Sequence, residues 1–163
     1  MSQDSETPPP GGQFLVYQTE DGKLKIDVRF EGEHMILRPP HRSYFGRSPE
    51  TRELWWQRVG DASAARNPKS IVGTWALERG ICTSADGKAL PAPYGGSAGL
   101  GRVAFTADGR MMAVLCDTSA SLPAGAEREF NSYCGNFTFD GARLVTRVFA
   151  NSAPVFAIGL AAL

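Results

Sequence analysis

The sequence predicts a mainly all-β fold, because apolar residues alternate with period two in three successive segments, each containing an Asp-Gly pair at its turn. Three antiparallel ribbons in succession favour a barrel or sandwich over an α/β fold. The chain has 163 residues, and a domain of about 150 residues buries roughly 70% of its unfolded surface. A chain of this length can therefore form one stable hydrophobic core.

Charge and cysteine content narrow the function classes. Seventeen basic residues balance seventeen acidic ones, so no overall field attracts a phosphate backbone, and we expect no nucleic-acid partner. The apolar segment 153–163 is too short for a membrane span, which needs about 20 residues in a helix. Three widely spaced cysteines and an N-terminus without an apolar signal segment predict a cytoplasmic location.

The N-terminal part divides into a leader and a hairpin. Residues 1–12 are polar and rich in proline and glycine, which predicts a disordered leader. Residues 13–33 predict a β-hairpin with a three-residue loop at Glu20-Asp21-Gly22. This loop length places the apolar side chains on one face, namely Phe14, Val16, Leu24, Ile26, Val28 and Phe30.

Residues 34–70 predict an irregular linker with one short helix. Pro49 follows Ser48 and precedes Glu50 and Glu53, an arrangement typical of a helix start, and the helix would continue to Gly60.

Residues 71–163 predict the barrel part of the chain. Ile71 to Glu78 is expected to be a strand, and Cys82 to Gly99 a long loop rich in glycine and proline. Two hairpins follow, turning at Asp108-Gly109 and Asp140-Gly141. Their inward faces are predicted to carry Val103, Phe105, Met111, Ala113 and Leu115 in the first, and Tyr133, Gly135, Phe137, Leu144, Thr146 and Val148 in the second. Gly135 would mark a bend in the sheet.

Several motifs in this part follow one another in a recognisable order: Ile71-Val72-Gly73-Thr74-Trp75, Pro93-Tyr94-Gly95, Gly101-Arg102, Phe105 to Met111, Tyr133-Cys134-Gly135 and Phe139-Asp140-Gly141. With them, Ile71 to about Ser152 resembles the bacterial and fungal lipocalin-like domain family. The resemblance implies an antiparallel barrel with an apolar interior.

The strand opening Gly73-Thr74-Trp75 is similar to the glycine-x-tryptophan motif of lipocalins, whose indole closes the barrel base under an arginine from a late strand. The resemblance gives Trp75 that closing role and assigns no arginine. Closing a barrel around a ligand takes about eight strands, and the matching part supplies roughly five. The sequence therefore predicts an incomplete barrel, whose open edge would promote self-association.

Two short stretches near the N-terminus, Val16 to Gly22 and Ile26 to Arg29, resemble the opening of RhuM-type virulence-associated proteins. Together with the lipocalin-like part, the chain would then resemble the first part of two families and the last part of neither. One hypothesis is a fused or decayed reading frame, which a proteomic search for the full-length product in the source cell would test.

The candidate ligand-binding residues are Trp75, Phe105, Met111, Tyr133 and Phe137. An apolar pocket with few polar groups is typical of small-molecule sites, although plain core packing explains the same residues equally well. The expected function is binding of a small hydrophobic or amphipathic molecule without turnover. The alternatives are a cyclase-like or accessory enzyme that uses the same cavity, and a RhuM-like fragment with no independent activity.

No catalytic residue, metal ligand or cofactor is predicted. His34 and His41 are the only histidines, and the stiff Pro39-Pro40 between them offers no chelating face. The loop from Gly95 to Gly101 lacks the lysine and helix of a phosphate-binding loop. Trp55 and Trp56 beside arginines could stack on single-stranded nucleic acid, but such a pair more often covers a core or an interface.

Overall fold

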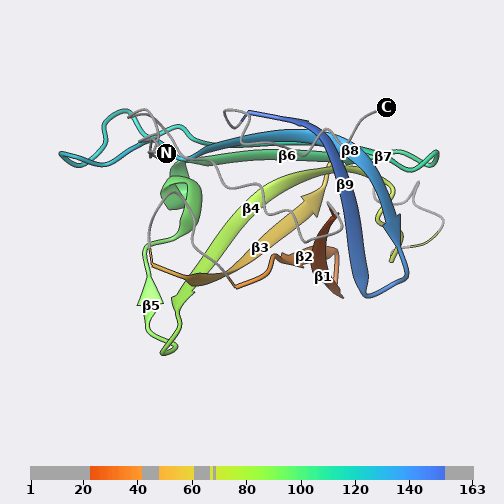
Figure 1. Ribbon diagram of the computed structural model, residues 1–163, viewed down its shortest axis with the longest axis horizontal. Helices are drawn as coiled ribbons and strands as arrows, with labels where there is room; N and C mark the ends of the chain where they lie inside the picture. The colour runs from red at the N-terminus through yellow and green to blue at the C-terminus, as the bar shows by residue number, and fades with distance from the viewer. Residues whose placement is uncertain (1–22, 42–47, 61–66, 68, 153–163) are drawn as a thin grey trace, which may run out of the picture.

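The computed structural model describes residues 23–41, 48–60, 67 and 69–152, and strands make up most of this part (Figure 1). A 3₁₀ helix, η2 (Pro93–Ala98), lies between the strands β5 (Ala89–Leu90) and β6 (Gly99–Phe105). The strands in chain order are β1 (Lys23–Glu31), β2 (His34–Arg38), β3 (Glu50–Arg58), β4 (Gly73–Ser84), β5 (Ala89–Leu90), β6 (Gly99–Phe105), β7 (Arg110–Asp117), β8 (Phe130–Phe139) and β9 (Arg143–Asn151). In this described part, no helix is long and apolar enough to cross a membrane.

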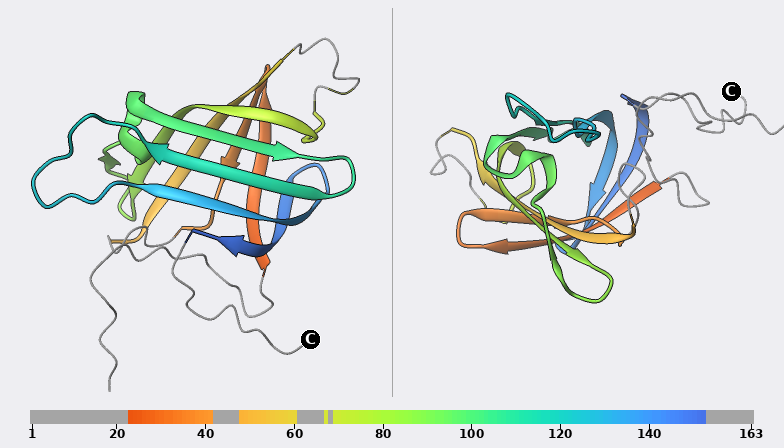
Figure 2. Two further views of the ribbon diagram at one scale, coloured as in Figure 1. Left: turned by 90° about the horizontal axis from the view of Figure 1, so that it is seen from above. Right: turned by 90° about the vertical axis from the view of Figure 1, so that its left-hand side faces the viewer.

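All strands except the two-residue β5 form a closed antiparallel barrel (Figure 2). The hydrogen-bonded order runs β3-β2-β1-β9-β8-β7-β6-β4, and β3 also pairs with β4, which completes the ring. Leu24 lies opposite Thr146 where β1 meets β9, and Leu54 lies opposite Gly80 where β3 meets β4. The predicted all-β antiparallel barrel is confirmed.

The prediction that the barrel is incomplete is wrong. Strands β1 to β3, which precede the lipocalin-like part in the chain, fill the space between β9 and β4. The outer edges of β4 and β9 are therefore paired with β3 and β1. Self-association through an open sheet edge loses its physical basis, because these backbone groups already have partners.

Strand β1 confirms half of the predicted N-terminal hairpin. Leu24, Ile26 and Val28 are buried and alternate with exposed residues, as the pattern predicts. The partners of β1 are β2, reached through a turn at Gly32 with φ +57°, and β9. The strand predicted from Phe14 onward lies outside the described residues, as do the predicted leader 1–12 and the segment 153–163.

The short helix predicted after Ser48 is wrong, because Glu50–Arg58 forms strand β3. Glu50, Arg52, Leu54 and Trp56 point inward and are buried, and the residues between them are more exposed. The period of two is hard to see in the sequence, since two of these four inward positions carry charge. Hydrogen bonding to β2 on one edge and β4 on the other outweighs the local helix-start signal.

The two C-terminal hairpins agree with the prediction. Strands β6 and β7 meet at a turn in which Gly109 has φ +83°, and β8 pairs with β9. The first hairpin buries all of its predicted inward residues, namely Val103, Phe105, Met111, Ala113 and Leu115. The predicted long loop Cys82 to Gly99 instead contains the end of β4, then β5 and η2.

Gly135 lies at a register shift between β8 and β9, as expected for a bend. A Cβ atom added at Gly135 would lie 2.1 Å from the carbonyl oxygen of Arg147, which is backbone and can move only with its strand.

We expect Gly135→Ala to lower the free energy of unfolding by about 3 kcal/mol, measured by urea denaturation. The exposed neighbouring change Asn136→Ala should stay within about 0.5 kcal/mol. Equal stability of the two variants would contradict the close approach of these strands.

Candidate functional site

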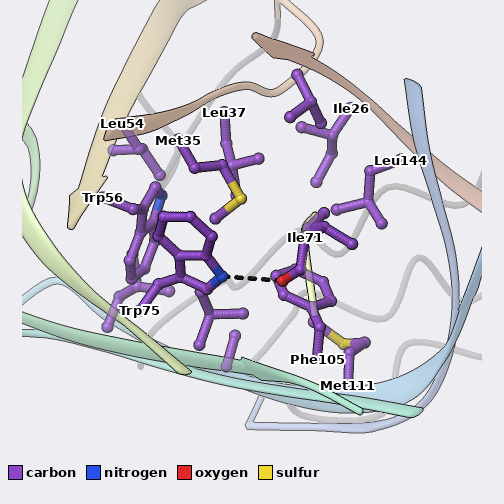
Figure 3. Packing of buried hydrophobic residues seen from close by; sticks show 14 of the residues in the cluster. Ile26, Met35, Leu37, Leu54, Trp56, Ile71, Trp75, Phe105, Met111 and Leu144 are labelled. Carbon is purple, nitrogen blue, oxygen red and sulfur yellow. Dashed lines mark hydrogen bonds between the residues drawn. The ribbon is translucent and has the colours of Figure 1, made fainter. Parts of the chain in front are cut away.

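Trp75 from β4 is buried in the hydrophobic cluster inside the barrel. Its side chain is 1% exposed, and its indole Nε1–H donates a hydrogen bond of 2.9 Å to the carbonyl oxygen of Ile71 (Figure 3). Phe30 packs against the indole with ring centroids 6.3 Å apart. The closing role that the resemblance gives to Trp75 stays a prediction.

The arginine that covers this tryptophan is Arg58, at the end of β3. Its Cζ atom lies 4.1 Å from the indole centroid, and its guanidinium donates hydrogen bonds of 2.7 Å to the carbonyl oxygens of Val72 and Ser70. Burial lowers the pKa of Arg58. Gly73 has φ +134°, and a Cβ atom there would lie 2.5 Å from Arg58 Nη1. The glycine, the tryptophan and the arginine thus form one unit.

The five predicted ligand-binding residues all belong to one hydrophobic cluster inside the barrel. Trp75, Phe105 and Met111 are buried, and Tyr133 and Phe137 are partly buried. Phe105 and Phe137 meet edge to face with centroids 5.0 Å apart. The same cluster contains residues from both parts of the chain, including Ile26, Met35, Trp56 and Leu144 (Figure 3).

An internal cavity of about 40 Å³ lies in this cluster, away from Trp75. Of the five predicted residues, Phe105 and Tyr133 line it. Most of the wall is aliphatic or aromatic: Leu24, Ile26, Leu37, Leu54, Trp56, Tyr94, Val103, Ala113, Leu115 and Leu144 complete it with Pro39, Arg52 and Asn131. At roughly 10–15 Å³ for each water molecule, the cavity as it stands holds only a few waters. A larger molecule enters only if part of the wall moves.

A buried ionic cluster adjoins the cavity through Arg52, which is part of the cavity wall. Arg52 from β3 donates hydrogen bonds to Glu50 (Nε to Oε1, 2.8 Å) and to Glu129 (Nη2 to Oε1, 2.9 Å). The side chains of Arg52, Glu50 and Glu129 are 1%, 4% and 9% exposed. Burial alone would lower the pKa of Arg52, but Tyr94, Glu129 and Glu50 together outweigh it and raise this pKa. The guanidinium therefore keeps its charge inside the protein.

Tyr94 in η2 covers this ionic cluster. Its backbone N–H donates a hydrogen bond to Glu129 Oε2, and its ring centroid lies 5.3 Å from Arg52 Cζ. Tyr94 is buried and has φ +56°, the one positive φ of a non-glycine among the described residues. Gly95 and Gly96 follow with φ +78° and +61°. Such backbone strain is held by its surroundings and is common at ligand clamps.

The sequence prediction missed the polar part of this site. Arg52 and Glu50 were assigned to a helix, and Glu129 had no recognisable motif around it. The period of two from Glu50 to Trp56 was the available signal for the two β3 residues. The histidines His34 and His41, for which no site role is predicted, lie outside the cavity lining: His34 Nε2 is 2.5 Å from Glu78 Oε2, and His41 Nδ1 is 2.8 Å from Thr51 Oγ1.

Comparison with known proteins supports the lipocalin-like resemblance. A family model described as a lipocalin-like domain matches residues 72–156. No curated protein and no solved structure matches the chain. The resemblance of the N-terminal stretches to RhuM-type proteins finds no support in these comparisons, and the described part of that segment, Lys23–Glu31, is a barrel strand. The family match covers more than half of the chain, so this protein belongs to the lipocalin-like domain family.

Proposed function

We propose that this protein binds a small, largely apolar molecule inside its barrel. The observation that carries the proposal is the apolar cavity beside the strained Tyr94 cover. Interiors of eight-stranded barrels are wide enough either to be filled by side chains or to hold one small ligand. A cavity next to a strained covering segment favours the second use.

Entry of a ligand would proceed by movement of η2. Opening would break the contacts that hold the cover, which include the Tyr94 N–H bond to Glu129, the contact of the Tyr94 ring with Arg52, and two hydrogen bonds from Thr118, N–H (3.0 Å) and Oγ1 (2.5 Å), to the carbonyl oxygen of Ala98. Release of the positive φ at Tyr94 favours the open form by about 1–2 kcal/mol. The partly exposed Pro39, Asn131 and Tyr133 line the same cavity, so an opened η2 would widen it toward solvent.

Filling the cavity tests this function. Ala113 on β7 is 2% exposed and lines the cavity, whereas Ala104 on β6 has its side chain on the outer face of the sheet. We expect cyclopentanone, titrated into ¹⁵N-labelled protein, to shift the backbone amide signals of Ala113, Leu115 and Tyr133. Ala113→Ile should abolish these shifts, because the added side chain occupies the cavity, and Ala104→Ile should keep them.

The outcome is read only in variants with native near-ultraviolet circular dichroism. Absence of saturable amide shifts in the wild type, or equal shifts in the two isoleucine variants, would contradict binding inside the barrel.

A further inference from the structure

Two polar atoms of uncharged side chains inside the barrel have no hydrogen-bond partner among the described residues. They are Nε1 of Trp56 and Oγ1 of Thr146, in side chains that are 1% and 0% exposed. Trp56 is part of the cavity wall. Thr146 lies on the inward face of β9, opposite Leu24, which also lines the cavity. Leaving a buried donor unsatisfied is unfavourable, so native proteins rarely do so without a reason.

The other tryptophans show that Trp56 is exceptional. The indole N–H of Trp75 donates to the carbonyl oxygen of Ile71 at 2.9 Å, and that of Trp55 donates to Glu53 Oε1 at 3.0 Å. An indole nitrogen can only donate, so Trp56 requires an acceptor. Its Nε1 atom is also shielded from solvent in the closed barrel, so bulk water does not supply one.

The charges around the cavity restrict the acceptor that could enter. Arg52 is the one cationic residue that the described part of the chain contributes to the cavity wall, and the carboxyl groups of Glu50 and Glu129 already oppose its charge. An acidic headgroup would bring a third carboxylate toward one guanidinium and would lose its own hydration. A neutral oxygen, such as that of a carbonyl group, accepts the hydrogen bond from Trp56 Nε1–H without the desolvation and repulsion that a carboxylate would bring.

We propose that the ligand of this barrel is a small neutral molecule with a carbonyl-type oxygen, and that Trp56 Nε1–H donates the hydrogen bond that recognises it. The inference rests on the proposed function, since it names the ligand class for the same cavity. Trp56 acts as the specificity-determining residue, and the apolar wall supplies most of the contact.

Three indole N–H signals in the ¹⁵N spectrum provide the test, with Trp55 and Trp75 as internal references. The probes are cyclopentanone and methylenecyclopentane, which have the same shape and differ in the oxygen acceptor, together with cyclopentanecarboxylate as the anion. We expect cyclopentanone to move the Trp56 indole proton downfield and to leave the other two in place. Methylenecyclopentane should shift interior amide signals without this downfield movement, and the carboxylate should bind more weakly than the ketone.

The variant Trp56→Phe keeps an aromatic ring and removes the donor. One hydrogen bond corresponds to about a threefold to tenfold change in affinity. The ratio of cyclopentanone to methylenecyclopentane affinity should therefore fall by that factor in Trp56→Phe and stay unchanged in Trp55→Phe, the matched control. Using a ratio removes the effect of the smaller ring, which acts on both probes.

The possible failures are distinguishable. If neither neutral probe shifts the interior amides, the proposed function itself is wrong and this inference falls with it. If both bind but the Trp56 indole signal stays in place and the ratio is the same in Trp56→Phe, the barrel binds ligands and the assignment of Trp56 is wrong. Preferred binding of the carboxylate would overturn the neutral ligand class.

Discussion

Replacing Arg52 by methionine is expected to lower the free energy of unfolding by about 3–5 kcal/mol. The change keeps an unbranched apolar side chain in the wall but leaves Glu50 and Glu129 buried without the guanidinium that bridges them. Loss of one partner from a buried ionic cluster costs far more than loss of an exposed pair, because the remaining charges stay desolvated. Urea denaturation followed by tryptophan fluorescence measures the effect.

The matched control is Arg143→Met, which removes an exposed ion pair of 2.9 Å with Asp27. Surface pairs of this kind contribute about 0–1 kcal/mol. The triple variant Arg52→Met, Glu50→Gln, Glu129→Gln should recover part of the loss, since it removes the buried carboxylates as well. A loss below about 1 kcal/mol in Arg52→Met would show that this cluster is hydrated rather than buried.

Separating the two parts of the chain should have the largest effect of all. We expect a fragment of residues 67–152 to lose its cooperative thermal unfolding, because it keeps β4 to β9 and lacks the three strands that join β9 to β4. Its apolar interior and two strand edges would be exposed to water. Near-ultraviolet circular dichroism and binding of a fluorescent hydrophobic dye measure the loss of fixed packing.

A permuted chain is the control for this deletion. Lys23 at the start of β1 pairs with Arg147, four residues before the last residue of β9, so a linker can join the end of β9 to the start of β1. A chain that runs from residue 67 to 152 and then, through a short flexible linker, from 22 to 60 keeps every strand neighbour. It should unfold cooperatively like the natural order. A fragment 67–152 as stable as the whole chain would contradict the closing role of β1 to β3.

The parts of this fold that could be predicted from the sequence are those set by residues close together in the chain. Strands β6 to β9 follow from period-two patterns around Asp-Gly turns, and Trp75 follows from a short motif. Strand β3 was missed because the inward positions Glu50 and Arg52 are charged. The cost of burying them is offset by the hydrogen bond between Arg52 and Glu129, which comes 77 residues later in the chain. A pattern within nine residues carries no information about such a partner.

Closure of the barrel was missed for a related reason. The family resemblance covers Ile71 to about Ser152 and places the arginine of the tryptophan motif late in the chain. Here Arg58 occupies that place from β3, ahead of Trp75 in sequence. The pairings of β3 with β4 and of β1 with β9 join parts of the chain that are assigned separately by local patterns. Sequence order therefore suggested two fragments where the structure has one barrel.

The most direct test of this account is an NMR measurement of nuclear Overhauser contacts across the two seams of the barrel. In the uniformly labelled full chain, contacts should join Leu24 to Thr146 across β1 and β9, and Leu54 to Gly80 across β3 and β4. Paired residues in antiparallel strands have Cα atoms only about 4.5–5.5 Å apart, so both sets should be strong. Contacts within β6 to β9 but none across either seam would mean that the N-terminal strands do not close the barrel, and the interior site proposed here would not exist.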